Sequence, residues 1–339
     1  MTRWKCTVAY DGSGYCGWQS QRNGNSVQEQ IESALYHICG KKINILASGR
    51  TDAGVNAWGQ VFHFDSDTEM KERKWQGAIN AFLPGDIHIR KVERKDERFH
   101  ARYCVSWKQY DYRINFGEYN VMERNHVYQC PYKADIERMR QASLYLIGTH
   151  DFTSFNSNSL SETPDQVRTV YDIRMSLDHD VLTISYSGNG FLRYMVRMMS
   201  AELLAAGSGK IEPEEVKRVL EAKDKRAAHR NAHPEGLTLQ EVHYFDILAQ
   251  DETVFVRSLT RDDPSALIKI NEDHAVCSVC GRHDKQLYGF YVPQESAMYF
   301  LPEGKERVQH ACELLEKGEQ RKICVKSAEN LIDLAGSFH

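Results

Sequence analysis

The stretch GRTDAGV, residues 49–55, places one carboxylate, Asp52, between two glycines and two positions after Arg50. Glycines at both ends permit a tight, exposed turn. The segments on either side, residues 43–47 and 59–64, have the alternating or clustered apolar pattern of strands. We therefore expect Asp52 to lie on a loop held by two strands, where catalytic groups are often placed. The alternative is an ordinary turn residue with Arg50 as its surface partner.

The segments around this loop predict a first half in which strands and helices alternate. The pattern indicates strands at residues 5–10 and 86–92 and helices at residues 26–40 and 74–82. In the first helix, Ser26 and Glu29 have the spacing of a capping box, and Gly40 is a typical helix end. The order strand–helix–strand–strand–helix–strand is typical of ferredoxin-like and RNA-recognition folds.

The second half repeats this order loosely. Strands are predicted at residues 106–115, 168–177, 181–187 and 237–244, long helices at 135–147 and 191–206, and short helices at 213–222 and 224–231. We therefore predict an α+β fold of two ferredoxin-like or RNA-recognition-like halves, whose antiparallel sheets join around a central cleft. The predicted domains are residues 1–98, residues 99–245 and a small appended α+β module at residues 246–339.

The length and the charge distribution limit the classes of protein to which the chain can belong. The 339 residues contain no apolar run of about 18, so no membrane span is expected. Residues 1–6 lead directly into a strand without a signal peptide, which favours the cytoplasm and nine cysteines that are reduced or bound to metal. Residues 245–339 contain 11 Lys and Arg against 16 Asp and Glu, whereas the first 244 residues contain 32 against 31. A body this close to neutral can still carry a basic cleft for phosphates.

The chemistry is expected to come from a carboxylate with arginine and aromatic support. The chain has no Walker loop, no GxGxxG fingerprint, no HExxH and no GxSxG elbow. If the two halves are related by a pseudo-twofold axis, Arg197 meets the Asp52 loop. Arg50 and Arg197 would then keep Asp52 ionised and lower its pKa, so that it serves as a nucleophile or a base. The alternative for Arg197 is a buried structural ion pair.

Nine short motifs occur in one order along roughly residues 3–244. They are YDGS at 10–13, GWQSQ at 17–21, GRTDAGV at 49–55, NAFLPGDI at 80–87, FHAR at 99–102, KQYDY at 108–112, DFTSF at 151–155, FLRYMVR at 191–197 and EGL at 235–237. With these motifs the chain resembles the tRNA pseudouridine synthase A family. The position of Asn56 departs from the resemblance, because a histidine is more usual there.

The resemblance implies a role for each matching residue. Asp52 would be the catalytic aspartate, paired with Arg197, and Tyr110 would stack on the target uracil. Arg50 would take the place of the flipped nucleotide or hold its phosphate, and Leu237 would line the base pocket. The family implies a homodimer that holds one tRNA, targets uridines at positions 38 to 40 of the anticodon stem-loop, and needs no cofactor for catalysis.

The reaction is physically consistent with these residues. Isomerising uridine requires cleavage of a C–N glycosidic bond, rotation of the uracil and formation of a C–C bond. A carboxylate can stabilise or trap the oxocarbenium character of the ribose, as in glycoside hydrolysis, or remove a ribose proton to give a glycal. The sequence leaves both routes open. A base in a stem must first be flipped out and held by stacking.

Residues 245–339 lie beyond the resemblance. They contain Cys277 and Cys280 in a CxxCG pattern, followed by further metal-ligand types at His283, His310, Cys312 and Cys324. The sequence allows a structural zinc in which Cys277 and Cys280 are joined by two of these four residues, with Cys312 and Cys324 as the expected pair. A redox-inert cysteine pair or a degenerate metal site is the alternative.

Two other functions fit the sequence less well. A non-catalytic RNA-binding or RNA-folding protein would keep the cleft, but binding alone does not need the Asp52 carboxylate. A pseudouridine synthase with a different RNA target would keep the chemistry and use the tail to choose its substrate.

Overall fold

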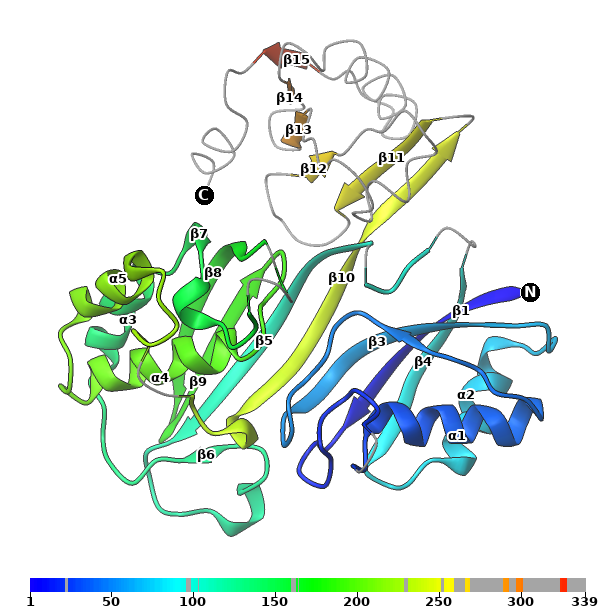
Figure 1. The fold of residues 1–339 in the computed structure, drawn as a ribbon, viewed down its shortest axis with the longest axis horizontal. Coiled ribbons are helices and arrows are strands. Elements are labelled where there is room, and N and C mark those ends of the chain that lie inside the picture. The colour runs from blue at the N-terminus through cyan, green and yellow to red at the C-terminus, as the bar shows by residue number, and fades with distance from the viewer. Residues whose placement is uncertain are drawn as a thin grey trace. The chain divides into compact units, whose positions relative to one another are not determined.

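The computed structural model shows two compact units, one formed by residues 1–95 and 107–242 and the other by residues 96–106 and 243–339 (Figure 1). Side chains are described up to residue 244. The described residues are 1–21, 24–95, 99–102, 104–159, 163, 165–228, 231–250, 253–258, 266–268, 289–292, 297–300 and 324–327.

The first half of the first unit has the predicted order of elements. These are β1 (Thr2–Tyr10), α1 (Val27–Cys39), β2 (Leu46–Ala47), β3 (Asn56–Ser66), α2 (Glu72–Phe82) and β4 (Ile87–Lys95). Helix α1 begins where the capping box predicts, because the Ser26 side chain accepts a hydrogen bond from the Glu29 backbone N–H. It ends at Gly40, whose φ of 66° lies in the left-handed region that glycine tolerates best.

Helices α1 and α2 lie side by side against the sheet of β4, β1 and β3 (Figure 1). Both strand pairs are antiparallel, and alternate residues of β1, including Cys6 and Val8, are buried. The indole of Trp75 from α2 packs edge-on against Phe64 of β3, with 5.1 Å between ring centroids. This apolar layer makes a rigid support for the loop between β2 and β3.

The second half contains three longer helices and most of the remaining strands. Its elements are β5 (Val105–Asn115), η1 (Val121–Glu123), β6 (Tyr128–Gln129), α3 (Ile136–Leu144), β7 (Gly148–Asp151), η2 (Thr153–Phe155), β8 (Val167–Asp178), β9 (Val181–Gly188), α4 (Met195–Gly207), α5 (Pro213–Ala222), η3 (Pro234–Gly236) and β10 (Leu237–Gln250). Helix α4 is largely buried and contributes Met199 and Leu203 to the core.

The helix predicted at residues 224–231 is wrong over its described part, residues 224–228, which form a turn. Lys223 ends α5 with a left-handed φ of 50°. The Asp224 carboxylate then accepts hydrogen bonds from the backbone N–H and the guanidinium of Arg226. Such side-chain-to-backbone bonds compete with helix formation.

The two halves share one sheet with the strand order β4-β1-β3-β10-β5-β9-β8-β7. Strand β10 lies between β3 and β5 and runs parallel to β3, with Thr238 opposite Asn56. The predicted α+β class is therefore confirmed. Both predicted halves belong to the same compact unit, and the domain boundaries at residues 98 and 245 stay predictions.

The second unit contains strands in its described residues. Strand β11 (Thr253–Ser258) pairs with the end of β10, and β12 (Ala266–Ile268), β13 (Gly289–Val292), β14 (Ala297–Phe300) and β15 (Cys324–Ser327) form a separate sheet. In the same unit the Tyr244 hydroxyl donates a hydrogen bond to the Ala101 carbonyl. No helix in the described part of the chain has the length and apolar character that a membrane span requires.

Candidate active site

The Asp52 loop, defined as residues 48–55, connects β2 to β3 and is fixed by buried polar groups. Gln60 of β3 accepts a 2.7 Å hydrogen bond from the Ser48 hydroxyl and donates a 3.0 Å bond to the Gly49 carbonyl. From β5, the Lys108 ammonium donates to the Ser48 carbonyl at 2.8 Å. A Cβ atom at Gly49 would lie 2.8 Å from that ammonium nitrogen, so glycine makes room for Lys108.

The loop is also held from the segment that follows β1. The buried hydroxyls of Tyr10 and Thr51 are 2.7 Å apart and hydrogen-bonded. Gly17, at a left-handed φ of 95°, packs so closely that a Cβ atom would lie 2.6 Å from the Thr51 carbonyl oxygen. Gly54 has a φ of 76°, which explains the second glycine of GRTDAGV. These contacts fix the backbone on both sides of Asp52.

Asp52 meets Arg197 of α4. The Asp52 Oδ2 atom lies 3.6 Å from Arg197 Nη1, and the two side chains are only 19% and 12% exposed. Arg197 also donates a 2.8 Å hydrogen bond from Nε to the Ala232 carbonyl. Because that bond fixes the guanidinium, the charge opposite Asp52 has a defined position. These two residues are therefore paired as predicted. Their carboxylate and guanidinium lie where the fold excludes most of the solvent.

The pKa of Asp52 is raised, whereas the arginines near it in the sequence and fold led us to expect a lowered pKa. Burial is the largest cause and raises the pKa, because desolvation penalises the charged carboxylate. The nearby positive charges of Arg197 and Arg193 lower it and offset part of that effect. The expectation was wrong because charge pairing can be read from residue types, whereas the degree of burial cannot.

Tyr194 links the two arginines and was not singled out as a site residue by sequence. Its ring centroid lies 5.0 Å from the Arg197 guanidinium carbon and 5.1 Å from that of Arg193, within the range of cation–π contacts. Tyr194 also has a left-handed φ of 65° at the start of α4. Such a backbone is uncommon for a bulky residue. The available signal was its position between the two arginines in FLRYMVR.

Arg50 is not an ion-pair partner of Asp52. It is exposed, and its side chain makes no hydrogen bond or ion pair with the residues that the structure describes. The predicted cluster of Asp52 with both Arg50 and Arg197 is therefore wrong in its Arg50 contact. The guanidinium of Arg50 remains available for a ligand.

Tyr110 and Leu237 come from neighbouring strands of the shared sheet. Tyr110 of β5 is 8% exposed, and its ring meets Phe191 edge-on with 5.3 Å between centroids. Burial raises the pKa of Tyr110, and electrostatic interactions with Tyr10 and with the Asp52 carboxylate raise it further, so its hydroxyl stays neutral. Leu237 is buried at the start of β10, just before the residue that pairs with Asn56 at the end of the Asp52 loop.

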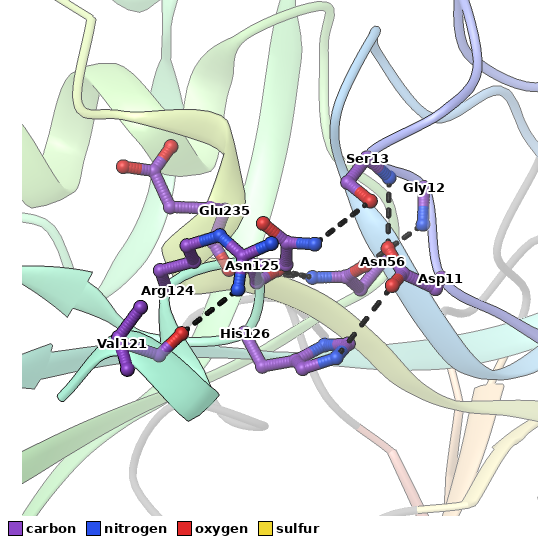
Figure 2. Close-up of polar contacts among 9 residues, drawn as sticks. All are labelled: Asp11, Gly12, Ser13, Asn56, Val121, Arg124, Asn125, His126 and Glu235. Atoms are coloured by element: carbon purple, nitrogen blue, oxygen red, sulfur yellow. Dashed lines mark hydrogen bonds and ion pairs between the residues drawn. The ribbon is translucent and has the colours of Figure 1, made fainter.

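Asn56 connects three segments at the exit of the Asp52 loop. Its buried amide accepts a 2.8 Å hydrogen bond from Gly12 N–H and donates to the carbonyls of Asn125 at 2.8 Å and Glu235 at 3.3 Å. Figure 2 shows this amide between the segment after β1 and the segment after η1. The contact is extended by Asn125, which donates to the Ser13 hydroxyl, and by an ion pair between His126 and Asp11 at 3.7 Å.

The predicted zinc ligands Cys277, Cys280 and Cys312 lie outside the described residues, as do His283 and His310. Cys324 begins β15, where the backbone alone is described. Among described side chains, no group of three or more His, Cys, Asp or Glu has a metal-binding arrangement.

Comparisons with known proteins assign the family. The family model described as tRNA pseudouridine synthase matches residues 7–104 and 142–245. A protein named tRNA pseudouridine synthase A 1 from Bacillus cereus is 46% identical over 246 residues, which are 72% of this chain and 99% of the relative. Proteins named tRNA pseudouridine synthase A from Oceanobacillus iheyensis and Bacillus subtilis are 46% and 43% identical, over 72% and 71% of this chain and 97% and 99% of their own lengths. The chain belongs to the tRNA pseudouridine synthase family.

Proposed function

We propose that the protein isomerises uridine to pseudouridine in tRNA, with Asp52 as the catalytic carboxylate. One observation carries the proposal. Asp52 is mostly buried on a rigid loop, and it pairs with Arg197, whose guanidinium is fixed by a second hydrogen bond. A chain that only binds RNA gains nothing from a desolvated carboxylate, which repels phosphates. The names of relatives that align over nearly their whole length support the same reaction.

Asp52 acts on the ribose of the target uridine. In the reaction the C1′–N1 bond breaks, the uracil turns, a C1′–C5 bond forms, and the proton lost from C5 is balanced by one gained at N1. The Asp52 carboxylate either traps C1′ covalently or removes a ribose proton to give a glycal. Its raised pKa favours both routes, because a carboxylate with a higher pKa is a stronger base and nucleophile.

Tyr110, Arg50 and Leu237 bind the flipped nucleotide. The aromatic face of Tyr110 stacks on the uracil, and Leu237 lines the apolar side of the base pocket. Arg50 fills the gap left by the nucleotide or holds its phosphate, a role consistent with a guanidinium that has no described protein partner. Together these groups keep water from the intermediate, which would otherwise hydrolyse.

We also propose the finer assignments of substrate and assembly. The targets are uridines 38 to 40 of the anticodon stem-loop, the enzyme is a cytoplasmic homodimer that holds one tRNA, and it needs no cofactor for catalysis. The support is the motif set at residues 10–237 together with the family membership. Mass-based pseudouridine mapping of RNA from cells with and without the gene identifies the modified positions. Loss at other positions alone would contradict the anticodon-stem assignment.

Asp52→Asn provides the direct test of the reaction. The amide supplies neither the charge nor the nucleophile, so isomerisation of a uridine-containing tRNA transcript should fall below detection while tRNA binding persists. Turnover within about tenfold of wild type, equivalent to about 1.4 kcal/mol in the barrier, would reject Asp52 as the catalytic carboxylate. Binding without turnover by the wild-type protein would favour the non-catalytic alternative.

The tail is proposed to hold a structural zinc through Cys277, Cys280, Cys312 and Cys324. This hypothesis rests on the residue types and the CxxC spacing alone. Elemental analysis should find close to one zinc per chain and none in a Cys277→Ser, Cys280→Ser double variant. A metal-free wild-type protein with a tail that resists proteolysis would contradict it.

A further inference from the structure

Trp58 and Arg90 form an exposed cation–aromatic pair on the first half of the sheet. The Arg90 guanidinium carbon lies 4.0 Å from the centroid of the Trp58 ring, and Arg90 Nη1 donates a 2.9 Å hydrogen bond to the Trp58 carbonyl. The Trp58 side chain is still 55% exposed. Because the guanidinium lies over one face of the indole, we attribute this exposure to the opposite face and the ring edge.

Two irregular strand pairings bring these residues together. The register of β1 against β3 shifts between Val8 and Tyr10, opposite Trp58, and the register of β1 against β4 shifts between Thr7 and Val8, which leaves Arg90 as the extra residue. Bulges of this kind redirect a side chain and are frequent next to active sites. The two side chains therefore meet across the intervening strand β1.

The pair is held rigidly by its neighbours. Gln76 of α2 donates a 2.8 Å hydrogen bond to the Arg90 carbonyl. At Gly59, directly after Trp58, a Cβ atom would lie 2.2 Å from the Gln240 carbonyl oxygen, so β10 packs against this backbone. A preorganised aromatic ring loses little conformational entropy when a ligand stacks on it.

The charge around the pair suits an anion. On β4 and β1, the ammonium groups of Lys5, Lys91 and Lys95 share the carboxylate of Glu93 at 3.3, 3.1 and 3.6 Å. Arg90 precedes Lys91 on β4, so cations outnumber the single carboxylate of Glu93 along β1 and β4. An open aromatic face beside excess positive charge is the combination that binds single-stranded nucleic acid, in which bases stack and phosphates approach the cations.

We infer that Trp58 and Arg90 form an accessory stacking site for an unpaired nucleotide of the tRNA substrate, separate from the base pocket at Tyr110. The inference rests on the proposed function. Trp58 follows Asp52 by six residues, so the fully extended chain limits their separation to about 20 Å. One RNA molecule can therefore occupy both places. The base stacks on the open face of Trp58, and a flanking phosphate contacts Arg90.

The fluorescence of Trp58 gives a direct test in the full-length protein. The other four tryptophans, Trp4, Trp18, Trp75 and Trp107, are at most 5% exposed. Acrylamide should therefore quench Trp58 selectively, and saturating unmodified tRNA transcript should protect it. Trp58→Leu should remove the quenchable fraction. Quenching that tRNA leaves unchanged, although the tRNA is bound, would overturn the inference while the proposed function stands.

Measurements of the affinity for the same tRNA transcript provide a second test of the stacking site. Trp58→Leu should weaken binding by about 5- to 150-fold, which corresponds to about 1–3 kcal/mol for one stacked base, and Trp58→Phe should lose less. Arg90→Gln should reduce the salt slope of binding by about one phosphate contact. Tyr36→Ala is the matched control, because Tyr36 is an aromatic residue of α1 that is 54% exposed.

Two results would contradict the accessory site. Unchanged affinity in Trp58→Leu, with the control also unchanged, would show that the exposed indole takes no part in binding. Protection of Trp58 that appears without RNA as protein concentration rises would show instead that a second copy of the chain covers it. A wild-type protein that binds no tRNA would refute the proposed function together with this inference.

Discussion

Arg197 faces the Asp52 carboxylate at 3.6 Å while its Nε is bound to the Ala232 carbonyl at 2.8 Å. One guanidinium thus serves two acceptors from different segments. The position of the cation is set by the backbone carbonyl as well as by the carboxylate. The charge on Asp52 is consequently stabilised by a fixed neighbour, although burial still determines the direction of its pKa shift.

Loss of Arg197 should move the acid limb of the activity profile. Burial already raises the pKa of Asp52 above the usual value of about 3.9, so the limb of kcat/KM should lie above that pH in the wild type. Arg197→Gln removes the largest opposing charge and should move the limb to higher pH. Arg193→Gln is the comparison, with a smaller shift expected because Arg193 is exposed. An unmoved limb in Arg197→Gln would show that another group controls it.

Asp52→Asn should stabilise the fold at neutral pH. Because the pKa of Asp52 is raised in the folded state, folding favours its protonated form, and this contribution to stability is lost as pH rises through the folded pKa. The amide of the Asp52→Asn variant stays neutral at every pH, so the variant does not lose this contribution to the free energy of unfolding. The difference in free energy of unfolding between variant and wild type should therefore grow from pH 3 to pH 7. Denaturant unfolding at several pH values measures it, and a difference that shrinks over this range contradicts the assigned direction.

Tyr110→Phe should be much milder than Tyr110→Ala. Within the described part of the chain the Tyr110 hydroxyl has no hydrogen-bond partner, whereas its ring packs on Phe191. Phenylalanine keeps the stacking face, and alanine loses about 1–3 kcal/mol of base stacking. Single-turnover rates at saturating tRNA, with thermal unfolding as a control for folding, compare the variants. Equal defects in two folded variants would assign the effect to the hydroxyl.

Asn56→Ala should destabilise the first unit by roughly 1–3 kcal/mol, because three backbone groups lose their buried amide partner. Asn56→His should cost less, since an imidazole retains one donor and one acceptor. Ser13→Ala is the matched control, because it removes only an exposed contact with Asn125. Denaturant unfolding measures all three. A neutral Asn56→Ala would show that water replaces the amide at no cost.

The sequence by itself determined the local features of this protein. The capping box at Ser26 and Glu29 and the glycine at residue 40 set the ends of α1, because these signals act within a few residues of the backbone they satisfy. The glycine at residue 54 similarly follows from a left-handed turn. Alternation of apolar residues was enough for the α+β class, and the ordered motifs were enough for the family.

Only the tertiary structure decided which distant side chains come into contact and how far they are buried from solvent. Arg50 is two residues from Asp52 but does not pair with it, whereas Arg197, far along the chain, does. The parallel pairing of β3 with β10 and the contact of Trp58 with Arg90 likewise join segments with no common sequence signal. The pKa of Asp52 depends on how completely the packed halves exclude water, and desolvation is a property of the assembled fold rather than of any residue type.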